Sequence, residues 1–579
     1  MAPAAGNYGF KRDFFVCFSL TILAACLFAL AFPNPLIEDG FGAAAFIAYL
    51  PVFITIYRSN AASCLFFGAF YGLLSTSLFN YWLFNFHPAA LAVVSSIHLV
   101  YFAVFFVFLR LAVVLFPRSH YLLQWLLWIV FEYTRSLGFL GYTYGVTGYS
   151  QYLNETLISS AAIFGVWGVS ALVIFPQAFF ASVFNGAARF APRPARAAAY
   201  GAPSQGEVSL RSSIKRNAAI FILTAAVLSA AFLYGVFTKE DFSDFPYRII
   251  SLVQQNDDPW KNDVEGYSRT LRSLKNLSRE ALLESRKKYG RESDMVVWPE
   301  TAFVPMIYWH THYRTDAAYY ALVKELTDFL AEEKTPFLIG NDDGRRVLRD
   351  GRLVRVDYNA AMLFEKGRIA GLYRKRRLVP FSEHFPYKKQ LPFVYDALVK
   401  GGMTFWEKGE EAVVFKTGNE DGSFSFSVPI CFEDGFGGIS REFVRGGAQI
   451  IVNITNDSWG KSIACQKQHL ALSVFRAVEN RRSVVRAASS GQTCVIYPNG
   501  KIAAQAPAFT AAILSEKVPL SDKETFYTKH GDFFPKICAA IAFALLIVGL
   551  IKFNIKKLRA ALTKITARCA SCLKPDKKR

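Results

Sequence analysis

The chain has 579 residues, 53% of them hydrophobic, and a formal net charge of +20 at pH 7. This composition excludes an ordinary soluble protein and indicates a membrane part joined to a folded domain. A basic chain is also compatible with nucleic-acid binding, but most of the excess positive charge lies beside predicted membrane helices, where membrane topology accounts for it. We therefore expect no nucleic-acid partner.

Eight apolar stretches each come close to the ~20 residues that cross a bilayer, and few charges interrupt them. They lie at 14–31, 41–57, 62–83, 92–116, 119–137, 157–185, 217–237 and 534–552. Because the first belongs to a multi-span series, a cleavable signal peptide is not expected. The predicted organisation is seven spans in 1–240, an outer domain in 241–530, an eighth span in 531–555 and a basic cytoplasmic tail in 556–579.

Positive charge alternates between the predicted loops. The loop 187–216 and the tail 556–579 are rich in Lys and Arg. The alternate loops contain neither residue: 32–40, 84–90 and 138–156. The positive-inside rule therefore predicts that both termini are cytoplasmic and that 241–530 lies on the opposite side of the membrane.

Two ionisable residues, Glu132 and Arg135, lie near the outer end of the fifth predicted span. Their spacing of three places them on one helix face. Ionisable groups at membrane depth usually face the helix bundle or an aqueous cavity. Two interpretations remain open: an ion pair that orients the helix, or a polar lining where a lipid head group enters.

From about residue 243 the sequence alternates between strand and helix patterns, which predicts an α/β domain with its own core. Helices are predicted at 263–289, 314–333 and 463–480. Strands are predicted at 247–254, 295–299, 336–340, 358–365, 367–373, 424–430, 448–454, 484–488 and 493–497.

Reactive side chains follow several of these strands. Glu300, Lys375, Cys431 and Asn456 all fall at or just beyond a predicted strand end, so we expect them to converge at one rim of the sheet. A cysteine thiol is nucleophilic only if a base removes its proton and a positive charge stabilises the product. Glu300 is the candidate base and Lys375 the candidate cation.

The motifs around these residues resemble the Glu–Lys–Cys signature of the carbon–nitrogen hydrolase, or nitrilase, superfamily. They are Trp298-Pro299-Glu300, Tyr373-x-Lys375, Leu378-Val379-Pro380-Phe381-x-Glu383 and Cys431-x-Glu433. Combined with eight spans, they are similar to the apolipoprotein N-acyltransferase family. The same family is matched by Val253-Gln254, Asn456-Asp457-Ser458-Trp459-Gly460 and Gln466-x-x-His469.

The resemblance implies a nitrilase-like αββα sandwich mounted on membrane helices. It implies that Cys431 accepts the acyl group, that Glu300 moves protons and that Lys375 stabilises the oxyanion. Glu383 and Glu433 are expected to hold these groups in position. It also implies a bacterial inner-membrane enzyme with its catalytic domain on the periplasmic face, no metal or other cofactor, and a monomeric state.

The implied reaction transfers a fatty acyl chain from a membrane phospholipid, through a Cys431 thioester, to the α-amine of a diacylglyceryl-cysteine at the N-terminus of an apolipoprotein. A substrate-contacting or gating role is expected for Trp260, Trp298, Asn456, Trp459, Glu132 and Arg135. For the aromatic residues, core packing remains the alternative. His469 is interpreted as a hydrogen-bonded structural residue rather than the base of a Cys–His pair.

Two other functions are alternatives to acyl transfer. A membrane-tethered amidase or nitrilase would use the same three residues on a soluble substrate, although eight spans exceed what a tether needs. A transporter or sensor with a binding domain is disfavoured by the sparse charge in the spans. Pairing of Cys465 with Cys494 stays open, and Cys569-x-x-Cys572 is a weak metal or redox motif.

Overall fold

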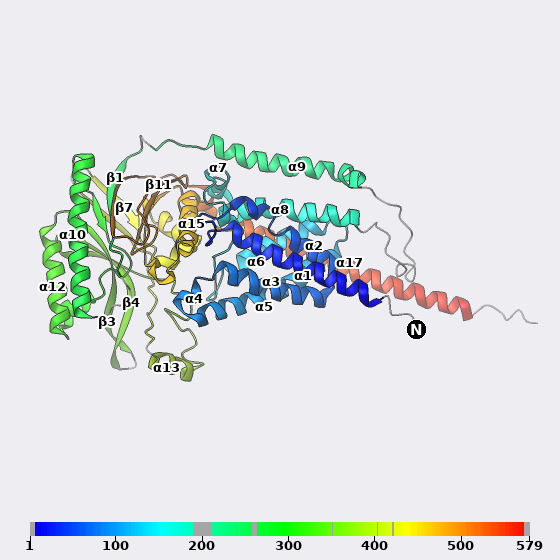
Figure 1. Ribbon diagram of the computed structural model, residues 1–579, viewed down its shortest axis with the longest axis horizontal. Helices are drawn as coiled ribbons and strands as arrows, with labels where there is room; N and C mark the ends of the chain where they lie inside the picture. The colour runs from blue at the N-terminus through cyan, green and yellow to red at the C-terminus, as the bar shows by residue number, and fades with distance from the viewer. Residues whose placement is uncertain are drawn as a thin grey trace, which may run out of the picture.

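A computed structural model describes residues 6–188, 210–242, 244–257, 263–349, 351–401, 403–419 and 422–572. Trp260 and most of the basic loop 187–216 lie outside these residues. The described chain forms a helical part and a two-sheet part that lie end to end (Figure 1). The N-terminal helix and the last helix both extend away from the sheets.

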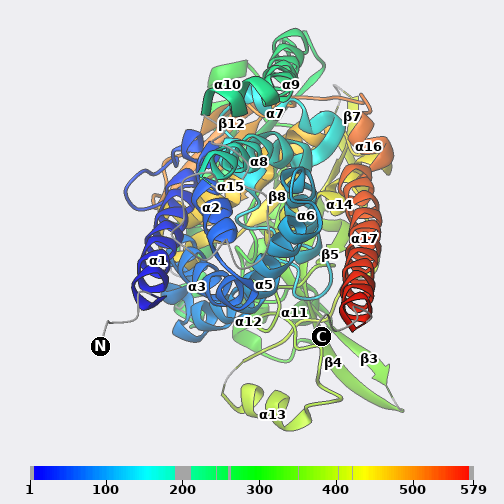
Figure 2. The same ribbon diagram turned by 90° about the vertical axis from the view of Figure 1, so that its right-hand side faces the viewer.

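The helical part consists of apolar helices. They are α1 (Gly6–Ala31), α2 (Leu50–Arg58), α3 (Ala61–Phe79), α4 (Leu83–Phe86), α5 (Pro88–Leu115), α6 (His120–Arg135), α7 (Glu155–Ile158), α8 (Ala161–Ala188), α9 (Leu210–Phe237) and α17 (Phe533–Cys572), with 3-10 turns η1 (Gly42–Phe46) and η2 (Thr147–Gln151). Seen from its end, the bundle has α1 and α17 on opposite sides (Figure 2).

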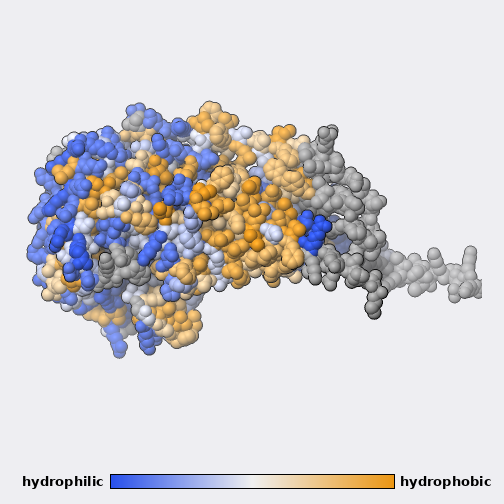
Figure 3. Space-filling model, viewed as in Figure 1, coloured by the Kyte–Doolittle hydropathy of each residue, from blue (hydrophilic) through white to orange (hydrophobic). Residues whose placement is uncertain are grey.

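Six helical segments in the described chain are long and apolar enough to cross a membrane: Arg12–Ala31, Ala61–Phe79, Pro88–Leu115, Ala161–Phe184, Ala218–Phe237 and Phe533–Thr563. The other two predicted spans are shorter, since the second corresponds to the apolar segment Gly42–Arg58 and the fifth to α6, which has 16 residues. Hydrophobic residues cover the visible face of the helical part, whereas hydrophilic residues dominate over the sheets (Figure 3). The predicted membrane character is confirmed.

The two-sheet part contains two six-stranded sheets, ordered β12-β1-β2-β3-β4-β5 and β11-β10-β9-β8-β7-β6. Their strands are β1 (Tyr247–Gln254), β2 (Met295–Val297), β3 (Phe337–Arg349), β4 (Arg352–Glu365), β5 (Arg368–Arg374), β6 (Val414–Asn419), β7 (Gly422–Ser427), β8 (Ile450–Thr455), β9 (Ser483–Ala488), β10 (Cys494–Ile496), β11 (Ile502–Gln505) and β12 (Ala512–Pro519). The central strands of each sheet, β1–β2–β3 and β7–β8–β9, pair in parallel. Parallel strands bring their carboxyl ends, and the residues that follow them, to one edge.

Helices cover the outer faces of the sheets. They are α10 (Val264–Tyr289), α11 (Ile307–Tyr313), α12 (Ala317–Glu332), α14 (Gly437–Arg445) and α15 (Ile463–Asn480), while α13 (Pro392–Lys400) and α16 (Phe526–His530) lie in connections, and η4 (Cys431–Gly435) and η5 (Asp457–Gly460) follow β7 and β8. A buried apolar core joins the inner faces, with Leu338 of the first sheet and Phe424 of the second. The expected αββα sandwich is confirmed.

The helical part and the sandwich interlock at a break in α8. Gly165 has φ +65°, so the helix hydrogen-bond pattern is interrupted there. The freed amide of Val166 donates to Glu479 of α15 over 3.0 Å. A side chain at Gly165 would meet the ring of Tyr527, its ideal Cβ lying 2.7 Å from a ring carbon. The glycine therefore allows both the helix break and the close packing.

Candidate active site

The candidate nucleophile begins a turn immediately after a strand. Cys431 is the first residue of η4 and has φ +50°, a left-handed conformation that is strained for a residue with a side chain. Backbone strain of this kind concentrates at functional sites. The turn starts where β7 has ended, and Ile430 forms an isolated bridge to Ile454 of β8. The cysteine is thus held at the sheet edge.

Glu300, the candidate base, follows β2, a short strand of the other sheet. The side chain of Glu300 is 7% exposed, and both of its oxygens accept hydrogen bonds. Oε1 accepts from Nζ of Lys375 over 3.1 Å and from Nδ2 of Asn359 over 2.8 Å. Oε2 accepts from the backbone amide of Asn456 over 2.9 Å. Donors from three separate segments therefore converge on one carboxylate.

Lys375 is fully buried between two carboxylates. Its Nζ lies 3.1 Å from Glu300 and 2.8 Å from Oε1 of Glu383. Burial alone would lower the pKa of Lys375, but the two carboxylates outweigh it and raise that pKa well above its usual value. The second oxygen of Glu383 accepts from the amide of Val379 over 2.9 Å, which fixes this carboxylate. Lys375 is a permanent positive charge in the site.

The thiol of Cys431 is not ionised at rest. Burial raises its pKa well above the usual value, the Glu300 carboxylate raises it further, and the Lys375 ammonium opposes both. Because the thiolate is the nucleophilic form, a neighbouring base has to remove the proton during reaction. Glu300 is the carboxylate whose charge acts most strongly on this thiol.

Glu433 joins the cysteine turn to the end of β5. Its Oε2 accepts from the amide of Ile430 over 2.8 Å, on the residue before the cysteine. Its Oε1 accepts from the amides of Arg376 and Arg377 over 2.6 and 2.9 Å, on the residues after Lys375. The hydroxyl of Tyr373 donates to both oxygens over 2.9 Å. One buried carboxylate thus fixes the backbone on either side of the site.

Comparisons with known proteins identify the family. The apolipoprotein N-acyltransferase N-terminal domain matches residues 24–179, and the carbon-nitrogen hydrolase domain matches 250–526. Apolipoprotein N-acyltransferase 1 of Treponema denticola is 41% identical over 90% of this chain and 94% of its own length. The protein of the same name in Treponema pallidum is 42% identical over 87% of this chain and 90% of its own length. The chain belongs to the apolipoprotein N-acyltransferase family.

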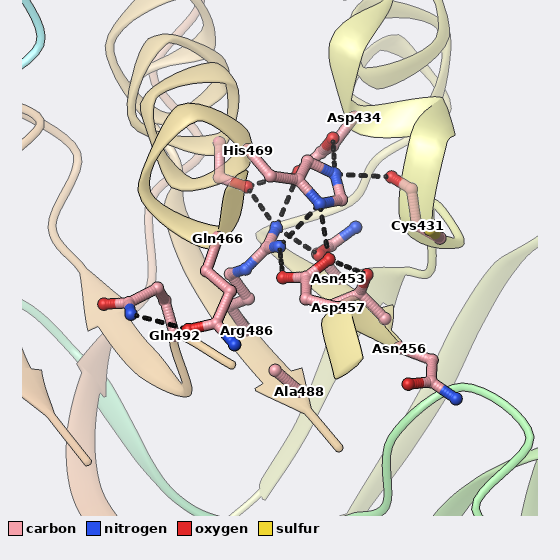
Figure 4. A network of polar contacts seen from close by, with 12 residues as sticks. Cys431, Asp434, Asn453, Asn456, Asp457, Gln466, His469, Arg486, Ala488 and Gln492 are labelled. Atoms are coloured by element: carbon pink, nitrogen blue, oxygen red, sulfur yellow. Dashed lines mark hydrogen bonds and ion pairs between the residues drawn. The ribbon is translucent and has the colours of Figure 1, made fainter. Parts of the chain in front are cut away.

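In this member of the N-acyltransferase family, a second polar cluster lies directly behind the cysteine (Figure 4). Nε2 of His469 lies 3.2 Å from the carbonyl oxygen of Cys431 and 2.9 Å from Oδ1 of Asp434. Nδ1 lies 2.8 Å from Oδ1 of Asp457. Arg486 forms ion pairs with both aspartates, and its Nη2 lies 2.8 Å from Nδ1 of the imidazole. All four side chains are buried.

The charges of this cluster balance when His469 is protonated, since two carboxylates then face one guanidinium and one imidazolium. Burial and Arg486 act to lower the pKa of His469, but Asp434 and Asp457 outweigh them and raise it to about 9. The prediction that His469 is hydrogen-bonded is confirmed, and its structural role stays a prediction. Sequence reasoning missed Arg486 and Asp434, whose roles depend on contacts between distant segments.

The residues that were expected to contact or gate substrate lie in different environments. Asn456 caps η5, and Trp459 of that turn packs edge-on against Phe86 of α4, with ring centroids 6.3 Å apart. These two residues therefore lie where the sandwich meets the membrane helices. Trp298 is fully buried and donates from Nε1 to Ser278 of α10 over 2.8 Å, so it belongs to the core beneath α10. For Trp298 the structure favours the core-packing alternative over a contact with substrate.

Glu132 and Arg135 both bind the outer loop that follows α6. Glu132 accepts from the amide of Thr147 over 3.0 Å, and Nη1 of Arg135 donates to the carbonyls of Tyr142 and Tyr144 over 3.1 and 2.9 Å. Both side chains line a cavity of about 20 Å³. A cavity of this size holds a water molecule and is too small for a lipid head group. Their placement favours loop anchoring.

The structure describes two of the remaining candidate cysteines, Cys465 and Cys494, but not the side chains of the Cys569-x-x-Cys572 motif. Cys465 and Cys494 are both buried and free, so the open question of their pairing is answered. The side chains of Cys569 and Cys572 lie outside the described part of the structure. Among the residues that are described, no cluster of three or more His, Cys, Asp or Glu side chains is arranged to hold a metal ion.

Proposed function

We propose that this protein transfers a fatty acyl chain from a membrane phospholipid to the N-terminal α-amine of a diacylglyceryl-cysteine on an apolipoprotein. The observation that carries the proposal is the hydrogen-bonded pair of Glu300 and Lys375, whose opposite charges both act on the thiol of Cys431 in its strained turn. The names of the relatives, which match across both parts of the chain, supply the acyl transfer to an apolipoprotein, and the family resemblance supplies the phospholipid donor and the diacylglyceryl-cysteine.

In the first half-reaction, Glu300 takes the thiol proton of Cys431, and the sulfur attacks the carbonyl carbon of the phospholipid ester. Negative charge then develops on the carbonyl oxygen, where the fixed charge of Lys375 stabilises it. Glu300 returns the proton to the departing glycerol oxygen. The products are a lysophospholipid and a thioester on Cys431.

In the second half-reaction, the α-amine of the acceptor attacks the thioester carbon. The carbon–nitrogen bond forms, the carbon–sulfur bond breaks, and Glu300 passes a proton from the nitrogen to the cysteine sulfur. Glu383 orients Lys375, and Glu433 holds the backbone on both sides of the site. Neither is assigned a direct contact with substrate.

The thioester has to survive until the acceptor arrives, so water has to be excluded. Asn456 and Trp459 contribute here, because η5 lies against α4 at the edge of the membrane part. Trp260 is proposed to act with them, on the strength of the family resemblance alone. Glu132 and Arg135 contribute indirectly by fixing the loop that contains Tyr142 and Tyr144.

The proposal includes an orientation in the membrane. Residues 1–240 and 531–555 form the membrane domain, 241–530 form the catalytic domain on the periplasmic face of the inner membrane, and 556–579 form a cytoplasmic tail. The arginine and lysine content of the loops supports this orientation. The direction in which α1 and α17 leave the sandwich agrees with it (Figure 1). We propose that the enzyme acts as a monomer without a cofactor.

A membrane-tethered amidase would use the same side chains, but here the helical part does more than anchor the sandwich to the membrane. The buried core around Phe432 and Leu472 of the sandwich also includes Val166 and Val173 of α8. The site is therefore built against the membrane helices, as an enzyme with two lipid substrates requires.

The proposal is tested by incubating the purified enzyme with phospholipid and a synthetic diacylglyceryl-cysteinyl peptide. The peptide is expected to gain the mass of one fatty acyl chain. The Cys431→Ala variant is expected to insert into membranes normally and to transfer nothing. Transfer by Cys431→Ala would contradict the mechanism, and release of ammonia from a soluble amide by the wild type would favour the amidase.

A further inference from the structure

Besides Glu300 and Glu383, a third carboxyl group, that of Asp342, lies in one row with the two side chains that donate hydrogen bonds to Glu300. Asp342 of β3 pairs with Asn359 of β4, and the amide of Lys375 donates to the carbonyl of Asn359 over 2.8 Å. Residues paired across neighbouring strands present their side chains on the same face. Asp342, Asn359 and Lys375 therefore form a row across β3, β4 and the end of β5. The latter two both donate to Glu300.

This row lies on the inner face of the sandwich. Leu338 precedes Asp342 by four residues on the same strand, so the two share a face, and Leu338 belongs to the core between the sheets. Asp342 is thus the point where the apolar inner face of β3 becomes polar, at the sheet edge where Glu300 lies. Its position indicates a role in the site rather than on the surface.

Two acceptor oxygens in this row have no donor among the residues that the structure describes. Oδ2 of Asp342 accepts from Nε1 of Trp406 over 3.2 Å, but its Oδ1 is buried and lacks a partner among the described residues. Oδ1 of Asn359 is likewise buried and has no hydrogen-bond partner among the described residues. Buried oxygens are normally hydrogen-bonded. Two neighbouring acceptors without donors fit a ligand that brings several N–H donors, such as an ammonium group.

The second half-reaction requires a proton acceptor besides Glu300. An α-amine is largely an ammonium group below its usual pKa of about 8, and it has to lose one proton before its nitrogen can attack. The nitrogen then loses a second proton as the amide forms. Only one of these returns to the sulfur of Cys431 through Glu300. The other has to leave the site by a different group.

Asp342 is suited to take this proton near neutral pH. Burial raises the pKa of Asp342 to about 7; the hydrogen bond from Trp406 opposes the shift, and the charges of Asp357, Glu300 and Glu383 add to it. Lys375 is paired with two of these carboxylates, Glu300 and Glu383. Glu383 itself is occupied by Lys375 and by the amide of Val379.

We propose that Asp342 is the acceptor-side base of the enzyme: its carboxylate binds the α-ammonium group of the incoming lipoprotein and takes the first of its two protons. This inference rests on the proposed acyl transfer. The amine then attacks the thioester, the carbon–nitrogen bond forms as the carbon–sulfur bond breaks, Glu300 returns the second proton to sulfur, and Asp342 releases the first to water. Per turnover, one thioester and one ammonium yield one amide, one thiol and one proton.

The test separates the two half-reactions in the full-length enzyme. Acylation by phospholipid is followed by intact mass, and transfer from the isolated acyl-enzyme to a diacylglyceryl-cysteinyl peptide is followed from pH 6.5 to 9. Asp342→Asn keeps the shape of the side chain but removes its proton chemistry. Glu407→Gln is the matched control, because this carboxylate lies beside Trp406 but pairs at the surface with Arg349.

Asp342→Asn is expected to acylate at the wild-type rate and to transfer at least about 10-fold more slowly at pH 7.5, where the Asp342 carboxyl is mostly ionised and the acceptor is still mostly an ammonium group. The ratio to wild type should shrink below about 3-fold at pH 9, where the free amine no longer needs a base. Glu407→Gln should match the wild type throughout. The inference would be overturned if Asp342→Asn slowed both half-reactions equally, slowed transfer by the same factor at every pH, or slowed neither half-reaction. Absence of acyl-enzyme in the wild type would instead contradict the proposed function.

Discussion

The carbonyl oxygen of Cys431 lies 3.2 Å from Nε2 of His469, so the residue that carries the thiol is tied through its own backbone to a buried charge cluster. The same imidazole contacts Asp457, and the preceding residue, Asn456, donates its amide to Glu300. One cluster therefore supports both the nucleophile and the base, although none of its charged groups is assigned a step in the reaction.

His469→Gln is expected to slow acylation of Cys431 by roughly 10-fold or more, because the turn and the loop of Asn456 lose their common support. The substitution leaves two buried carboxylates facing one guanidinium, which costs about 3 kcal/mol of stability. Single-turnover acylation and thermal unfolding of the detergent-solubilised protein measure both effects. His312→Gln is the control, since His312 is exposed. Equal behaviour of the two variants would contradict the positioning role.

The charge of His469 also predicts a dependence of stability on pH. The pKa of His469 is raised in the folded protein to about 9, above the usual value of 6.5, so protonation stabilises the fold. This contribution is complete below pH 6.5 and is lost as pH rises through 9. The melting temperature of the wild type should therefore fall between pH 6.5 and 9.5 by more than that of His469→Gln. Parallel curves would contradict a protonated histidine.

Glu433→Gln is expected to lower transfer activity by about 100-fold while the protein stays folded. An amide has only one acceptor oxygen and would turn a donor toward the backbone amides that Glu433 now accepts from. The positions of Lys375 and Cys431 would change together. Glu442→Gln is the matched control, because Glu442 pairs with the exposed side of Arg376. Wild-type activity in Glu433→Gln would refute this role.

Substitutions of Cys465 and Cys494 are expected to be mild. Both thiols are buried and free, so Cys465→Ala and Cys494→Ala remove a sulfur atom and no covalent link. Transfer activity should stay within about 2-fold of the wild type, with a small loss of melting temperature. Mass spectrometry of the wild type with and without reductant supplies the check. A change of two hydrogen masses, or a collapse of stability in either variant, would indicate a disulfide.

Gly165→Ala is expected to destabilise the contact between the helical part and the sandwich. Gly165 has φ +65°, and an added Cβ would lie 2.7 Å from the ring of Tyr527. The strain and the overlap together cost about 2 kcal/mol or more. Gly438→Ala is the control, because no atom lies within 4 Å of its ideal Cβ. Equal melting temperatures for the two variants would contradict the packing role of this glycine.

Local patterns predicted the parts of the fold in which hydrophobic periodicity is strong. The helix 463–480 and the strand 247–254 were predicted with the bounds of α15 and β1. By contrast, β3 extends to Arg349 rather than stopping near 340, because its second half is polar and pairs with β4 in a projecting hairpin. β6, β11 and β12 were also missed; all three are edge strands, whose partly exposed faces carry a weaker periodic signal than the central strands.

The candidate site was predictable where motifs follow strands, and hidden where contacts are long-range. Glu300, Lys375 and Cys431 could be located because each follows an apolar strand in a recognisable motif. Asp342 lies inside a strand among polar residues, and only the register of β3 with β4 brings it beside Asn359. Trp298 was misinterpreted because its motif adjoins Glu300, although the alternation of a strand turns its side chain toward α10.

The central claim is that Cys431 carries the acyl group. Intact mass spectrometry of the wild type and Cys431→Ser after incubation with phospholipid tests it most directly. The wild type is predicted to gain one fatty acyl mass, which hydroxylamine removes and which a diacylglyceryl-cysteinyl peptide discharges. Cys431→Ser should gain no hydroxylamine-labile mass. A wild-type protein that shows no acyl adduct while the peptide is still acylated would contradict the thioester mechanism.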